Sequence, residues 1–210
     1  HFLNLESRAA EAMINLRRDV SFKASLVRNW FIQIFWWIIF FPGFFSSDSL
    51  AAVGMARTGN LTNAFTASWA LYVRLFSFHG HFIGLLTLLD GLVLVYAVTR
   101  FAYSLFEKEN AAIASFILTL TPLVWGMGIT LWHDIPMTSG LLLVVAFFTK
   151  FGVGANKPSH MHIFDLSFGS VLISFRPNGF PTLLLFLFIL LIFKKINKQY
   201  IAISGLIGIT

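Results

Sequence analysis

The chain contains several apolar runs close to the length that a helix needs to cross a lipid bilayer, and this feature limits its fold most. The first run extends from Trp30 to Phe45 and is interrupted only by Gln33. A helix needs about 20 apolar residues to span the hydrocarbon core. Because lipid offers no partner to free backbone groups, such runs predict helices that hydrogen-bond internally. The sequence therefore predicts an all-α integral membrane protein.

Composition supports this class and argues against a water-soluble one. Hydrophobic residues make up 57% of the 210 residues and charged residues 11%, whereas soluble domains average about 45–50% and about 25%. The net charge of +6 does not indicate a nucleic-acid partner, because the basic residues are scattered between apolar runs. The chain has no cysteine, which excludes disulfides and thiolate chemistry.

We expect a polytopic transmembrane helical bundle with at least six spans. After the first run, the candidate spans are His81–Val98, Ala111–Gly128, Ile135–Phe148 and the longer segment Ile163–Phe193. The motif "RPNG" at residues 176–179 is a strong turn signal inside that longer segment, which then makes either one kinked pass or two short ones. A last run begins at Tyr200, and we expect the transmembrane domain, residues 30–210, to be incomplete there.

The basic residues predict an orientation. If residues 1–29 form a cytoplasmic lead-in and Ile163–Phe193 makes two passes, most Lys and Arg residues lie on the cytoplasmic side, as the positive-inside rule requires. The expected location is the cell membrane. The first outer stretch, residues 46–78, is too long for a simple turn. Its aromatic residues among small polar ones predict a helix lying along the membrane interface.

This orientation places four reactive side chains at the outer face: Asp48, His133, Asp134 and Arg176. Asp48 follows the first span, where it could act as a general base or cap the next helix. Asp134 could bind acceptor hydroxyls, help hold a divalent cation, or cap the helix after it. Arg176 could bind a phosphate or extend to the interface. Two acids and one His are not a recognisable metal site.

Other polar residues are weaker candidates. Arg57 and Arg74 are on the outer stretch and could contact a phosphate, but a surface role is favoured. Asp90 lies within the second span, where an acid is a functional hypothesis by default. We expect it to make an interhelical structural contact or to be protonated, with Thr87 near enough for hydrogen bonding.

Three motifs resemble one enzyme group. They are "FPGFFSSDSL" (41–50), "LWHDIPMTSGLL" (131–142) and "FRPNGFPTLL" (175–184). In this order they resemble the conserved outer loops of GT-C-type membrane glycosyltransferases, related to the protein mannosyltransferase and aminoarabinose transferase families. This sequence lacks the His-Pro pair that relatives often carry before the second span, and it has His133-Asp134 where a lysine or an acidic pair is commoner.

The resemblance implies a GT-C-like fold and a function. The enzyme would transfer a sugar from a polyprenyl-phosphate donor, with inversion, to an acceptor glycan, lipid or protein. Asp48 would be the general base, Arg176 would hold the donor phosphate, and His133 and Asp134 would position the acceptor or a metal. Asn178 would shape the turn beside Arg176 and belong to the substrate-binding residues. The alternatives are a transporter or flippase for a lipid-linked or anionic substrate, and a non-catalytic membrane subunit.

Overall fold

The computed structural model describes residues 21–60, 66–151 and 158–193, so most of the expected lead-in and the run from Tyr200 lie outside the described residues. The helices are α2 (Phe22–Ile39), α3 (Ser47–Thr58), α4 (Ala67–Phe76), α5 (Ile83–Leu105), α6 (Lys108–Leu120), α7 (Pro122–Gly128), α8 (Asp134–Phe151), α9 (His160–Ile173) and α10 (Gly179–Phe193). The strands are β1 (Phe44–Phe45) and β2 (Thr130–Leu131). The prediction of an all-α fold is confirmed, with these two short strands as an addition.

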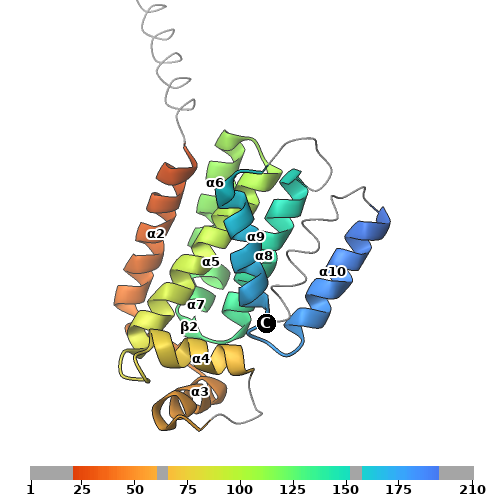
Figure 1. Ribbon diagram of the computed structural model, residues 1–210. Coiled ribbons are helices and arrows are strands. Elements are labelled where there is room, and N and C mark those ends of the chain that lie inside the picture. Colours follow the sequence, from red (N-terminus) through yellow and green to blue (C-terminus); the bar gives the residue numbers. More distant parts are fainter. Residues whose placement is uncertain (1–20, 61–65, 152–157, 194–210) are drawn as a thin grey trace, which may run out of the picture.

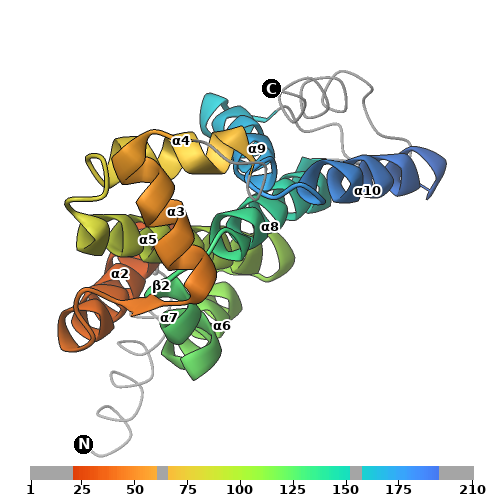
Figure 2. The ribbon, with the colours of Figure 1, turned by 90° about the horizontal axis from the view of Figure 1, so that it is seen from below.

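Helix α5 is the centre of a bundle, with α8 and α2 packed against it and α9 packed against α8. Figure 1 shows these helices running lengthwise, whereas α3 and α4 lie across the lower end. The view from below in Figure 2 shows α3 and α4 over that end. Helices α8 and α9 approach closely, because a Cβ on Gly140 would lie 2.4 Å from the carbonyl oxygen of Gly169. Such contacts between small residues are typical of helices in membranes.

Two of the described helices, α5 and α8, are long and apolar enough to cross a membrane, and the pair α6 and α7 would be a third candidate with a 65° bend. Pro122 at the start of α7 explains the break in the expected third span. The segment 163–193 forms two helices, α9 and α10, separated at the predicted "RPNG" turn. A total of six or more spans stays a prediction.

Helix α2 differs from the expected first span at both ends. It begins at Phe22, where Ser21 provides the N-cap, and it ends at Ile39 rather than Phe45. The expectation that the helix continues to Phe45 was wrong, because Pro42 and Gly43 interrupt it and the chain then forms β1. Gly43 has a φ of +110°, which a residue with a side chain rarely adopts.

The polarity of α2 is reversed relative to a helix in water. Its buried face carries Ser25, Asn29 and Gln33, while Phe31 and Ile38 have exposed fractions of 68% and 63%. The Asn29 amide donates to Thr99 of α5 at 3.2 Å. Buried polar contacts combined with an apolar outer surface fit a helix that faces lipid.

Candidate functional site

The two strands bring together the loop after α2 and the loop after α7. Phe44 pairs with Thr130 and Phe45 with Leu131, in parallel. Because parallel strands run in the same direction, the residues that follow them leave from the same end of the ladder. Asp48 follows β1 by three residues and His133 follows β2 by two. A hydrogen bond from the Ser49 hydroxyl to the Leu131 carbonyl also ties α3 to β2.

Asp48 lies in the first turn of α3, and its side chain is exposed. Ser46 is the N-cap of this helix, and its hydroxyl accepts from the backbone N–H of Ser49 in a capping box. Of the two roles that the sequence left open for Asp48, the cap therefore belongs to Ser46. An exposed carboxylate at a helix N-terminus is stabilised by the helix dipole, and the negative charge of Asp48 is near enough to raise the pKa of the His133 imidazole.

Arg176 and Asp134 form an ion pair, in which Nη1 of Arg176 donates to Oδ1 of Asp134. The two residues are far apart in sequence, and the turn between α9 and α10 brings them together at the start of α8. The side chain of Arg176 is 37% exposed and that of Asp134 is 19% exposed. Since a guanidinium has five N–H donors, this pair leaves donors of Arg176 for an anion.

His133 responds to the charges on both sides of it. Its partial burial lowers the pKa of the imidazole below its usual 6.5, the positive charge of Arg176 lowers it further, and the negative charge of Asp48 raises it. The imidazole is consequently neutral at pH 7 and presents one donor and one acceptor nitrogen. Asp48, His133, Asp134 and Arg176 are therefore brought together at one end of the bundle.

Helix α4 supports this group, a role that the sequence did not predict. The Thr66 hydroxyl donates to the Phe175 carbonyl at 2.7 Å, and the Ser68 hydroxyl donates to the Ser174 carbonyl at 3.0 Å. Both bonds hold the turn immediately before Arg176. Trp69 is 1% exposed, and its ring centroid lies 6.2 Å from that of His133. The sequence feature that could have indicated this role is Trp69, a large aromatic residue among small polar ones.

Asn178, Arg57 and Arg74, the other residues that the sequence offered near this group, make structural contacts. Asn178 is exposed, and its carbonyl accepts from the backbone N–H of Thr182 at 3.2 Å, which fits the expected turn-shaping role. Arg57 donates from Nε and Nη2 to the Gly80 carbonyl, at 3.3 and 3.1 Å, and so binds the loop before α5. Arg74 packs over Gly59 at the end of α3.

Asp90 makes an interhelical contact, as expected, and Thr87 is not its hydrogen-bond partner. The Tyr72 hydroxyl of α4 donates to its Oδ1 at 2.6 Å, whereas Thr87 donates to the carbonyls of Pro42 and Gly84. Asp90 is 1% exposed. Within the described residues, its Oδ2 and the amide of buried Gln33 have no hydrogen-bond partner.

In the described ranges, no three His, Asp or Glu side chains are close enough to hold a metal ion. Comparisons with protein-family models, with curated protein sequences and with solved structures found no match to this chain.

Proposed function

We propose that the protein is a GT-C-type membrane glycosyltransferase that moves a sugar from a polyprenyl-phosphate donor to an acceptor at the outer face of the cell membrane. The observation that carries this proposal is the grouping of Asp48, His133 and the Arg176–Asp134 ion pair at one end of the bundle. The proposal includes six or more spans, a cytoplasmic N-terminus and a GT-C-like arrangement of the helices.

Each residue has one task in the proposed reaction. The acceptor hydroxyl attacks the anomeric carbon while Asp48 takes its proton, and the bond from that carbon to the phosphate oxygen breaks with its electron pair staying on the polyprenyl phosphate. Arg176 stabilises the charge on the departing phosphate. Asp134, which the sequence offered as a ligand for acceptor or cation, orients Arg176. Neutral His133 hydrogen-bonds the acceptor.

Replacing the base tests the proposal. Asp48→Asn keeps the size of the side chain and removes its basicity, and Ser46 retains the cap of α3. We expect sugar transfer from a radiolabelled polyprenyl-phosphate sugar in proteoliposomes to fall at least about 100-fold. Glu109→Gln, a matched loss of one carboxylate in the first turn of α6, should leave the rate unchanged. A full rate in a correctly inserted Asp48→Asn protein would end the proposal.

A transporter is the second candidate, and one observation favours it. Gln33 and Asp90 are buried polar side chains inside the bundle, and a Cβ on Gly128 at the end of bent helix pair α6–α7 would lie 2.7 Å from the Gln33 amide nitrogen. Broken helices beside polar groups are typical of transporter sites. Transport predicts movement of a fluorescent polyprenyl-phosphate sugar across the bilayer that Asp90→Asn abolishes and Asp48→Asn leaves intact.

A further inference from the structure

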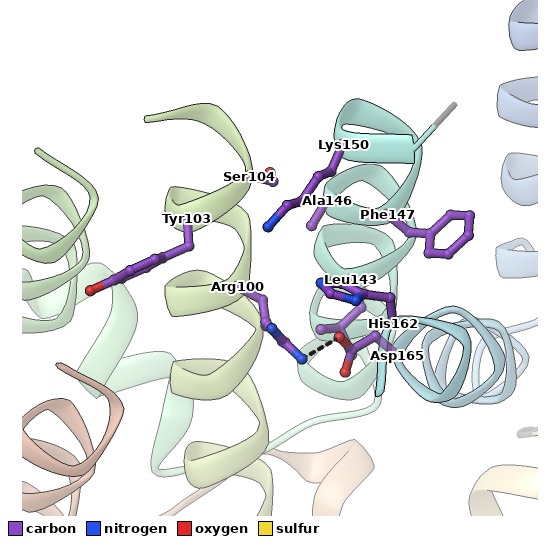
Figure 3. Close-up of a pocket in the computed structure, with 9 residues that line it drawn as sticks. All are labelled: Arg100, Tyr103, Ser104, Leu143, Ala146, Phe147, Lys150, His162 and Asp165. Atoms are coloured by element: carbon purple, nitrogen blue, oxygen red, sulfur yellow. Dashed lines mark ion pairs between the residues drawn. The ribbon is translucent and has the colours of Figure 1, made fainter. Parts of the chain in front are cut away.

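A hollow that contains charged side chains lies at the opposite end of the bundle from Asp48. Three helices line it: α5 contributes Arg100 and Ser104, α8 contributes Lys150, and α9 contributes His162 and Asp165. Figure 3 shows these side chains converging on the space between the three helices. The enclosed part of the hollow has room for about one water molecule, and the figure of about 330 Å³ for the whole includes space that is open to solvent. A larger ligand can therefore bind only at its mouth, where Lys150 is exposed.

The acid in this hollow is already paired. Arg100 Nη2 lies 2.9 Å from Oδ2 of Asp165, and the Tyr96 hydroxyl donates to Oδ1 of the same carboxylate. Arg100 Nε also donates to the Tyr96 hydroxyl at 3.1 Å. Both carboxylate oxygens of Asp165 and one edge of the Arg100 guanidinium thus belong to one hydrogen-bonded network. The positive charge of Arg100 and the negative charge of Asp165 cancel, and the pair forms one side of the hollow, called its wall below.

Lys150 adds a positive charge that this network does not balance. Of the residues that the structure describes, no acid lies within ion-pair distance of its ammonium. Its ammonium nitrogen lies 5.9 Å from the centroid of the Phe151 ring. Ser104 and His162 also line the hollow; the Ser104 hydroxyl donates to the Phe101 carbonyl at 2.7 Å, and Nδ1 of His162 is 2.7 Å from the Ser159 hydroxyl. Lys150 therefore gives the hollow a net positive charge.

Its place in the bundle indicates where an anion would come from. Asp134 begins α8 and Lys150 is the residue before its last, so at 1.5 Å per residue the two lie about 24 Å apart along the axis. This approaches the roughly 30 Å thickness of a hydrocarbon core. Figure 1 shows the ends of α5 and α8 and the start of α9 at the upper end, away from α3 and α4. The hollow is at headgroup level if α5 and α8 cross a membrane.

We propose that this hollow binds a phosphate group, with Lys150 as its cationic ligand and the Arg100–Asp165 pair as its wall. Basic pockets between helices at one membrane surface are suited to the headgroups of anionic lipids. A phosphate ester dissolved on that side has the same chemistry. The site is separate from the candidate site near Asp48 and does not depend on the proposed transfer reaction.

The test measures stabilisation of the full chain by two probes. One arm adds inorganic phosphate to protein in neutral detergent. The other compares phosphatidylcholine nanodiscs with and without phosphatidic acid. The variant is Lys150→Met, which keeps the stem and removes the charge. The control is Lys108→Met, an exposed lysine that begins α6 just after α5 ends.

Wild type and Lys108→Met should show the same rise in unfolding temperature, whereas Lys150→Met should need about tenfold more probe for the same rise. A response to inorganic phosphate identifies a dissolved ligand, and a response in nanodiscs alone identifies a lipid headgroup. Equal responses of Lys150→Met and Lys108→Met in both arms overturn the proposal, as does the lack of any response in wild type.

Discussion

At the scale of single residues, the charge on His133 depends on two neighbours from different loops. Arg176 lowers the pKa of the imidazole and Asp48 raises it, in addition to the lowering caused by burial. Sequence reasoning placed all three side chains at one membrane face, because each follows or separates predicted spans. The ion pair between Arg176 and Asp134 was not predicted, because a contact between turns that are far apart in the sequence depends on how the helices pack.

Substitutions of Arg176 and of Asp48 should therefore shift the pKa of His133 in opposite directions. We expect Arg176→Gln to raise the pKa of His133 and Asp48→Asn to lower it, because each change removes one Coulomb contribution. NMR of histidine-labelled protein in detergent micelles measures both shifts. Glu109→Gln at the opposite end is the control and should leave the titration curve in place. Shifts of the same sign in both variants would show that the charges do not act as described.

The same residue should make stability depend on pH. The pKa of His133 in the folded protein lies below 6.5, so protons bind more tightly to the unfolded state. The contribution of His133 to stability is complete above pH 6.5 or so, and it is lost as the pH falls through the folded-state pKa. His133→Gln should remove this part of the acid-side decline in unfolding temperature. An identical pH profile in the variant would contradict this prediction.

At the scale of elements, the pairing of β1 with β2 is the feature that could not be predicted from the sequence. The run from Trp30 to Phe45 is uniformly apolar, so hydrophobicity predicted one continuous helix across it. A strand of two residues carries almost no pattern of its own. Pro42 and Gly43 were the signal that the helix ends, and the partner strand is known only from the folded chain. By contrast, the turn between α9 and α10 was predictable because Pro and Gly stand within a short polar motif.

Gly43→Ala should weaken this ladder without changing any candidate site residue. An added Cβ would lie 2.4 Å from the Ile129 carbonyl oxygen, and the φ of +110° strains any side chain there. We expect a fall in unfolding temperature together with a loss of the influence of Asp48 on the His133 pKa. Gly54→Ala is the matched control, because its Cβ meets nothing within 4 Å and alanine favours the interior of α3. Similar behaviour of the two variants would show that the ladder does not join the loops.

At the scale of the whole molecule, composition and apolar runs were enough to predict an all-α fold, but not how many helices cross a membrane. Helices α5 and α8 are continuous and apolar, whereas α6 and α7 are bent apart by 65°. Run length alone cannot reveal such a bend. The proposed topology places Asn60, after α3, and Glu109, in the first turn of α6, on opposite sides of the bilayer.

The absence of cysteine from the sequence gives a direct test of this topology. Single Asn60→Cys and Glu109→Cys variants each add one thiol at an exposed position. In intact cells, a membrane-impermeant maleimide should label Asn60→Cys, whereas Glu109→Cys should react only after the membrane is opened. Labelling of both variants in intact cells, or of Glu109→Cys alone, would refute the orientation on which the transferase proposal depends.

The inward-facing polar side chains of α2 also have a consequence for biogenesis. Ser25 is 2.9 Å from the Tyr103 hydroxyl, and Asn29 donates to Thr99, so both bond to α5. During synthesis α2 emerges well before α5, and in lipid alone these groups would have no partner. If α2 crosses the membrane as the proposed topology requires, we expect the insertion machinery to retain it until α5 arrives, so that the two helices enter the bilayer as a pair.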